Sequence, residues 1–128
     1  MECLSAFTGI RIQINGVVTL EFTVDSGASA VVIPADVFRT LVRAKTITDA
    51  DLLGTSTVQF ADGSTATQQA FRIRSLRVGN TTLENVIGSV APEEGSLLLG
   101  QTFLSRFSTW SMDNHRHVLV LDEVGAPN

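Results

Sequence analysis

Residues 22–34 read FTVDSGASAVVIP, and this stretch joins two kinds of β-strand. The residues that lead into it alternate between apolar and polar side chains, which is typical of a strand with one buried face. Residues 30–33 are all apolar and suit a strand that is buried on both faces. Asp25, Ser26 and Gly27 therefore fall in the turn between two strands of a β-sheet.

The tripeptide allows two interpretations. Its composition alone favours an ordinary turn. The alternative is chemical, because hydrolysis of a peptide bond by carboxylates needs two acids about 3 Å apart that share one proton. One acid acts as a general base on water, while the other, protonated, polarises the scissile carbonyl. In that interpretation the Ser26 hydroxyl would bond to a partner loop, and Gly27 would let the backbone approach closely.

The rest of the chain predicts an all-β domain with one or two short helices. Alternating or apolar runs predict strands at residues 10–14, 18–24, 30–33, 56–60, 65–78, 82–90, 97–99, 107–112 and 118–121. Turn signals separate several of them, namely Asn15-Gly16, Asp62-Gly63, Gly79-Asn80 and Asp113-Asn114. Helical spacing occurs at residues 35–42 and 101–106, and residues 44–53 suit a loop or one helical turn.

The composition fits one packed domain and argues against several partners. The 128 residues are 44% hydrophobic and carry a formal charge of −4. The nine basic residues are scattered, which argues against a nucleic-acid surface. A single cysteine, Cys3, excludes an internal disulfide and a multi-thiolate zinc site. We expect one domain over residues 1–128, with its core at about 7–122 and a flexible tail at 125–128.

A membrane span is not expected in this chain itself. No run approaches the ~18 apolar residues of a membrane-spanning helix. No signal peptide opens the sequence, so a leader or anchor would belong to a longer parent protein.

Two spaced motifs resemble those of a known family. FTVDSGAS at residues 22–29, followed by VVIP at 31–34, resembles the catalytic loop of the retropepsin-like (clan AA) aspartic proteases. About seventy residues later, LLGQTFL at 98–104 is similar to that family's second signature, two apolar residues and a glycine that open a short helix. The resemblance extends from about residue 10 to residue 121, and it is closest to the bacterial single-domain members.

The resemblance implies a fold, an activity and a set of site residues. The fold would be an all-β half-barrel with a flap hairpin at residues 56–71 that closes over substrate. The activity would be that of an aspartic endopeptidase that hydrolyses peptide bonds with activated water and no cofactor. Asp25 would be the catalytic acid, Ser26 a gripping hydroxyl and Gly27 a backbone contact to substrate. Further substrate contacts would come from Ala28, Ser29, Ala61, Asp62, Gly63 and Ser64, and support from Leu98, Leu99 and Gly100. For Asp62-Gly63 an ordinary hairpin turn remains the plain alternative.

The chain departs from the family's pattern at two positions. Many retroviral members carry an acidic residue four positions after the catalytic aspartate and an arginine directly after the later glycine, and the two pair. Here Ser29 and Gln101 occupy these places. Because both charges are missing together, neither is left unpaired. We therefore expect a different dimer contact.

A second Asp-Ser/Thr-Gly does not occur in the chain. Among the other aspartates, Asp36 suits a helix N-terminus, Asp49 and Asp51 a polar loop, and Asp62 and Asp113 turns. One chain thus supplies one carboxylate, whereas the mechanism needs two. We predict a homodimer in which the Asp25 side chains of two copies meet on a two-fold axis.

The sequence gives weaker support for other kinds of functional site. His115 and His117 are two residues apart, a spacing that could suggest a metal site, but their place beside a turn favours a solvated hairpin without metal. A Gly-x-Ser-x-Gly nucleophile motif is missing, which disfavours serine hydrolase chemistry. Two hypotheses remain: an active endopeptidase for peptide or protein substrates, and a catalytically silent peptide-binding or assembly module on the same fold.

Overall fold

The computed structural model describes residues 2–59, 62–92 and 95–124. The strands are β1 (Glu2–Leu4), β2 (Ile10–Ile14), β3 (Val18–Val24), β4 (Val31–Pro34), β5 (Leu52–Gln59), β6 (Thr65–Val78), β7 (Thr81–Ala91), β8 (Leu98–Leu99), β9 (Phe107–Asp113) and β10 (Val118–Val124). The helices are α1 (Ala35–Arg43) and α2 (Gln101–Leu104), with a 3₁₀ turn at Asp49–Asp51. The all-β fold with short helices is therefore confirmed.

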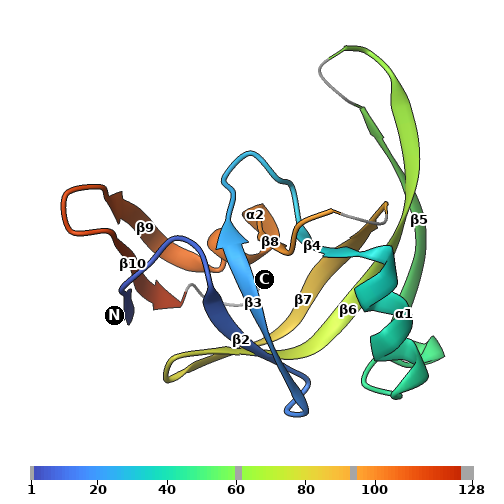
Figure 1. Ribbon diagram of the computed structural model, residues 1–128, viewed down its shortest axis with the longest axis horizontal. Coiled ribbons are helices and arrows are strands. Elements are labelled where there is room, and N and C mark those ends of the chain that lie inside the picture. Colours follow the sequence, from blue (N-terminus) through green and yellow to red (C-terminus); the bar gives the residue numbers. More distant parts are fainter. Residues whose placement is uncertain (1, 60–61, 93–94, 125–128) are drawn as a thin grey trace.

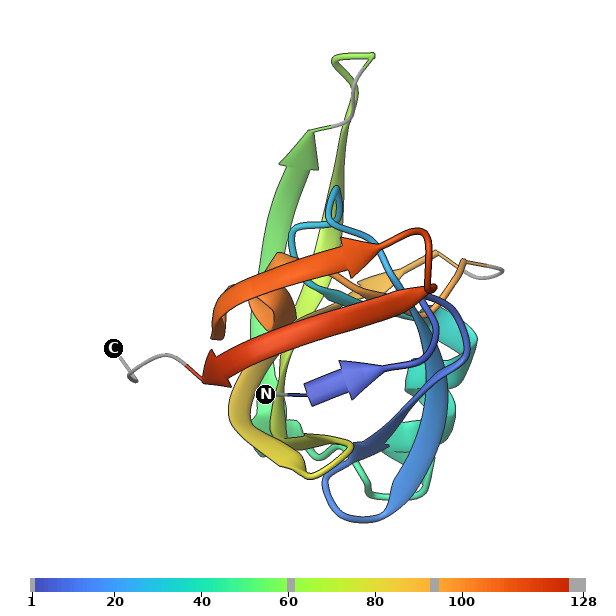
Figure 2. The same ribbon diagram turned by 90° about the vertical axis from the view of Figure 1, so that its left-hand side faces the viewer.

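Seven strands form a barrel-like sheet in the order β2-β3-β8-β4-β7-β6-β5. An additional pairing of β2 with β6 closes this sheet on itself and leaves β5 outside the ring. The strands β1, β10 and β9 form a separate sheet in that order, which lies beside the barrel in Figure 1 and in front of it in Figure 2. The closing pair covers the edge of β2 that would otherwise be open to other chains.

The first hairpin shows how local sequence builds the barrel. Ile10, Ile12 and Ile14 are buried, and the alternating residues between them are not. Asn15 and Gly16 have φ angles of 51° and 70°, the positive values that a type I′ turn requires. Both the alternation and the turn predicted from sequence are therefore confirmed.

The interior of the barrel is apolar and continuous with the underside of α1. Its largest fully buried side chains include Phe22, Phe71, Phe103, Ile33 and Leu99. Helix α1 covers one side of the barrel and places Phe38 against Phe71, with ring centroids 5.1 Å apart. Strand β4 lies between β8 and β7, and its consecutive residues Ile33 and Pro34 are both buried, as its unbroken apolar sequence predicted.

The β5–β6 hairpin extends well beyond the barrel (Figure 1). At its root the pairing of the two strands shifts register between Leu52 and Thr55. Gly54 lies in this bulge with a φ of 87°, a backbone conformation that strongly favours glycine. The side-chain amide of Gln69 bridges the bulge, because its Nε2 donates to the carbonyl oxygens of Gly54 (2.8 Å) and Ala70 (2.7 Å).

Two details of the secondary structure were not anticipated. Strand β1 is too short to show alternation, and it forms only because it pairs with β10 at the other end of the chain. Strand β5 begins at Leu52, four residues before the predicted strand. The 3₁₀ turn lies within residues 44–53, where the sequence predicted a loop or one helical turn. The proposed tail at 125–128 lies outside the described residues.

Among the described residues, no helix is long and apolar enough to span a membrane.

Candidate active site

The Asp25 loop, residues 25–30, is placed by a parallel pairing between β3 and β8. Thr23 and Val24 lie opposite Leu98 and Leu99. The backbone N–H of Asp25 continues this ladder by donating to the carbonyl oxygen of Leu99, at 3.0 Å. The two motifs singled out in the sequence thus form one structural unit.

Gly100 allows the Asp25 loop to pass directly beside it. A Cβ atom at this position would come within 2.3 Å of the carbonyl oxygen of Ala30 and 2.5 Å of that of Ala28. Any side chain larger than hydrogen would therefore displace the loop. The glycine is required here by close packing of two backbone segments, since its φ of −100° is open to other residues.

The first turn of α2 holds the loop through backbone hydrogen bonds. The N–H groups of Gln101 and Thr102 have no partners within the helix, and they donate to the carbonyl oxygens of Ala28 (2.9 Å) and Ser29 (3.2 Å). The Thr102 hydroxyl accepts from the N–H of Val31 (3.0 Å) and donates to the carbonyl oxygen of Ile87 (2.6 Å). Helix α2 therefore connects the loop to β4 and β7.

The Asp25 carboxylate is half-buried and has a defined orientation. Its Oδ1 accepts a hydrogen bond from the N–H of Gly27, at 2.9 Å, and its carbonyl oxygen accepts one from Ala28, at 3.1 Å. Ser26 and Gly27 are exposed. Within the described part of the chain, neither Asp25 Oδ2 nor the Ser26 hydroxyl has a hydrogen-bond partner. One carboxylate oxygen and one hydroxyl are thus available to another molecule.

Gln101 has a role that the sequence did not indicate. The sequence showed only that Gln101 stands where many retroviral members carry an arginine, whose acidic partner is replaced by Ser29. In the structure its side-chain Nε2 donates to the carbonyl oxygen of Ser26, at 2.7 Å. No periodicity or spacing signals such a contact, because it joins residues 75 positions apart.

Three of the predicted flap residues, Asp62, Gly63 and Ser64, lie in the turn between β5 and β6. The N–H and hydroxyl of Ser64 donate to Asp62 Oδ1, at 2.9 and 2.6 Å, and Gly63 has a φ of 87°. These hydrogen bonds, chiefly that from the Ser64 hydroxyl, lower the pKa of Asp62. The Asp62 carboxylate is therefore engaged in its own turn. Ala61 lies outside the described residues.

A cavity of about 300 Å³ lies between the hairpin arm and the end of β7. Its walls are residues 66–69 of β6 on one side and Val90, Ala91 and Pro92 on the other. The hairpin and the Asp25 loop extend from the same end of the barrel (Figures 1 and 2), so the cavity opens beside the arm that rises over that end. An extended peptide could bind along such a surface.

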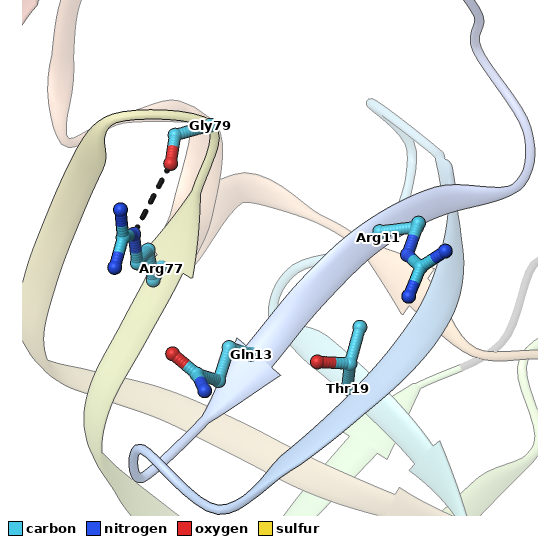
Figure 3. Close-up of a pocket in the computed structure, with 5 residues that line it drawn as sticks. All are labelled: Arg11, Gln13, Thr19, Arg77 and Gly79. Atoms are coloured by element: carbon cyan, nitrogen blue, oxygen red, sulfur yellow. Dashed lines mark hydrogen bonds between the residues drawn. The ribbon is translucent and has the colours of Figure 1, made fainter.

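A second concavity lies on the outer surface of the barrel, across β3, β2 and β6. Figure 3 shows the guanidinium groups of Arg11 and Arg77 at opposite ends of a row that contains Gln13 and Thr19. Arg77 donates from Nε to the carbonyl oxygen of Gly79, at 3.2 Å. The two charges do not converge on one point, so we assign no site here.

Asp51, which the sequence placed in a polar loop, is fully buried. Burial opposes ionisation of its carboxyl, but the N–H of Thr48 and the charges of Arg74 and Arg72 outweigh this and lower its pKa. The carboxylate oxygen Oδ1 lies 3.3 Å from Arg74 Nε and 3.5 Å from Arg72 Nη2. This group ties the 3₁₀ turn to β6 and is a structural element of the fold.

The two histidines are exposed beside the β9–β10 turn, as expected. The carboxylate of Asp113 accepts a hydrogen bond from Arg116 Nε, which is the main reason that its pKa is lowered, and further bonds from the backbone N–H groups of Arg116 and His115. In the part of the chain that the structure describes, no three His, Cys, Asp or Glu side chains gather as metal ligands.

In this small barrel the Asp-Ser-Gly loop is anchored by a Leu-Leu-Gly strand and a short helix, so the structure joins the two motifs that resemble the retropepsin-like aspartic proteases. A sequence profile described as "gag-polyprotein putative aspartyl protease" matches residues 10–106, and the chain belongs to this family. The resemblance drawn from the two motifs is therefore confirmed.

The structure is similar to a solved structure of a retropepsin-like aspartic protease from Rickettsia conorii, with 26% sequence identity and a TM-score of 0.65. The similarity covers 88% of this chain and 79% of that one. No curated protein matches the chain.

Proposed function

We propose that this protein is an aspartic endopeptidase whose active site is shared by two identical chains. The observation that carries the proposal is the Asp25 carboxylate, which is oriented by the Gly27 N–H and whose Oδ2 has no hydrogen-bond partner among the residues that the structure describes. Membership of an aspartic protease family supports peptide hydrolysis as the reaction.

The chemistry requires a second carboxylate beside the first. Three other aspartate side chains are engaged elsewhere. Asp51 pairs with arginines, and Asp62 and Asp113 accept hydrogen bonds within their own turns. A second copy of the chain supplies the missing acid if the two Asp25 loops meet on a two-fold axis. The exposed Ser26 hydroxyl then bonds to the partner loop and aligns the two carboxylates.

In such a dimer the two carboxyl groups share one proton, because two negative charges about 3 Å apart repel each other strongly. The ionised carboxylate takes a proton from water as the water attacks the scissile carbonyl carbon. The protonated carboxyl donates a hydrogen bond to the carbonyl oxygen, where negative charge develops. Proton transfer to the amide nitrogen then releases the two peptide products.

The β5–β6 hairpin acts as the flap of this site. It projects from the same end of the barrel as the Asp25 loop, and its bulge at Gly54 provides a place to bend. The cavity walled by β6 and Val90–Pro92 contributes to the groove that holds the substrate. Its volume of about 300 Å³ leaves room for a side chain of the peptide.

The test is cleavage of an unbiased peptide mixture by concentrated protein at about pH 4 to 7, the range in which a shared-proton dyad operates. We expect the wild type to cut and Asp25→Asn to lose at least about 10³-fold of the activity, since the amide cannot act as a base. Equal cleavage by both proteins would remove Asp25 from the mechanism. If neither cuts at concentrations where a dimer is demonstrated, the silent peptide-binding module becomes the better account.

A further inference from the structure

One peptide unit connects Gln101 to the proposed catalytic carboxylate. The carbonyl oxygen of Ser26 accepts a hydrogen bond from Gln101 Nε2, at 2.7 Å. The N–H at the other side of the same peptide bond belongs to Gly27, and it donates to Asp25 Oδ1, at 2.9 Å. Because a trans peptide is planar, its C=O and N–H are fixed relative to each other. A hydrogen bond that fixes the Ser26 carbonyl oxygen therefore also fixes the direction of the Gly27 N–H.

We propose that Gln101 is a positioning residue for catalysis, which orients the Asp25 carboxylate through the Ser26–Gly27 peptide. This inference rests on the proposed function, in which Asp25 is a catalytic acid. A hydrogen bond to the carbonyl oxygen also polarises the peptide, which strengthens its N–H as a donor. The effect reaches the carboxylate without direct contact between Gln101 and Asp25.

Gln101 is well suited to this role because its own position is rigid. Its backbone N–H is held by the carbonyl oxygen of Ala28, and its carbonyl oxygen accepts from the N–H of Ser105, at 2.8 Å. The neighbouring side chains of Phe103 and Leu104 are fully buried in the core. The amide therefore projects from a helix that the core itself fixes.

The carbonyl oxygen of Ser26 has few hydrogen-bond donors near it. Ser26 is exposed, and within the described part of the chain its carbonyl oxygen accepts a hydrogen bond from Gln101 alone. Without the amide, the peptide could rotate so that the Gly27 N–H no longer faces Oδ1, since glycine tolerates many backbone conformations. The turn at Ser26 and Gly27 therefore needs a hydrogen bond from another part of the chain to keep a single backbone conformation. The amide is uncharged, so the contact does not depend on a partner ion.

The kinetic test compares Gln101→Met, which has similar length but no donor, with Gln101→Glu. We expect Gln101→Met to lower kcat by about 3- to 10-fold, the range of one hydrogen bond, with KM little changed. Gln101→Glu should be at least as impaired at neutral pH, because a carboxylate cannot donate. Its activity relative to wild type should recover as the pH falls toward about 4, where a glutamic acid becomes protonated and can donate. Gln13→Met, on the outer face of the barrel, serves as the matched control.

A merely structural role for Gln101 would not produce this pattern. If only side-chain packing were lost, both variants would be less active than wild type, and the ratio of the Gln101→Glu activity to that of wild type would not change with pH. Equal activity of wild type and Gln101→Met, with wild type active, would overturn the inference and leave the proposed function intact.

A second measurement does not depend on activity. In ¹H–¹⁵N NMR spectra of the whole protein, we expect the Gly27 amide resonance to shift upfield and its hydrogen exchange to accelerate in Gln101→Met. The Gln13→Met control should leave that resonance unchanged. An unchanged Gly27 amide in Gln101→Met would overturn the inference even if the wild type proved inactive, whereas the failure of wild-type cleavage alone would count against the proposed function.

Discussion

Gly100 lies against the backbone of Ala30, so closely that a Cβ atom at position 100 would come within 2.3 Å of the Ala30 carbonyl oxygen. This contact brings the two sequence motifs together, because it lets the Leu-Leu-Gly segment pass beside the Asp25 loop. The geometry of the proposed catalytic acid thus depends on a residue that has no chemistry of its own.

Gly100→Ala should destabilise the protein by about 3 kcal/mol, because the added methyl group must displace backbone atoms that cannot move easily. Urea unfolding measures the change. Gly16→Ala is the matched control, since its φ is 70° but nothing lies within 4 Å of the new Cβ. Its cost should be about 1 kcal/mol, from backbone conformation alone. Equal losses for the two variants would contradict the steric explanation.

Asp51→Asn should destabilise the fold by about 2–4 kcal/mol at neutral pH, since it removes one partner of a buried ion pair. The lower half of that range is expected, because the side chains of Arg72 and Arg74 are 38% and 48% exposed and can be solvated. Urea unfolding at pH 7 measures the difference, and the exposed neighbour Asp49→Asn is the control.

The effect of Asp51→Asn should also depend on pH. The pKa of Asp51 is lowered in the folded protein, so its contribution to stability is present above its ordinary value of 3.8 and is lost as the pH falls through the folded value. The difference in unfolding free energy between wild type and Asp51→Asn should therefore shrink below about pH 4. A difference that stays constant down to the acid transition would rule out this ionic contribution.

Gln69→Met should loosen the root of the β5–β6 hairpin, because it removes the two hydrogen bonds that span the bulge at Gly54. We expect amide hydrogen exchange in residues 55–59 and 65–69 to accelerate by about 3- to 10-fold. Gln68→Met is the control, because this neighbouring amide makes no such hydrogen bonds to the described residues. The same exchange rates in both variants would mean that the Gln69 amide does not restrain the arm.

The proposed dimer predicts how mixtures of active and inactive chains behave. If Asp25→Asn exchanges freely with wild type at equal concentration, half of the wild-type chains acquire an inactive partner. Activity per wild-type chain should therefore fall to about half, and to about a quarter at a threefold excess of the variant. If the activity depended only on the concentration of wild-type chains, whatever the amount of the variant, a single chain would suffice for catalysis. Dilution below the dimer dissociation constant should reduce specific activity without unfolding the protein.

The strands of the barrel were predictable because their signals are local. Alternation of Ile10, Ile12 and Ile14 identifies a buried face wherever that strand lies, and Asn15-Gly16 selects its own turn. The Asp-Ser-Gly tripeptide could be placed at the end of a strand for the same reason. Strand β1 could not be predicted, because three residues carry no period and the strand is stabilised by β10.

The sequence by itself determined the all-β class, the position of Asp25 in a turn between strands, and the lack of a second such tripeptide. These follow from side-chain pattern and residue identity, which act over a few neighbours. Only the tertiary structure decided that Gly100 passes against Ala30, that Asp51 is buried beside two arginines, and that the Gln101 amide holds Ser26. Each of these contacts joins segments 20 or more residues apart. Such contacts depend on the path of the whole chain through the barrel, which no local pattern of residues encodes.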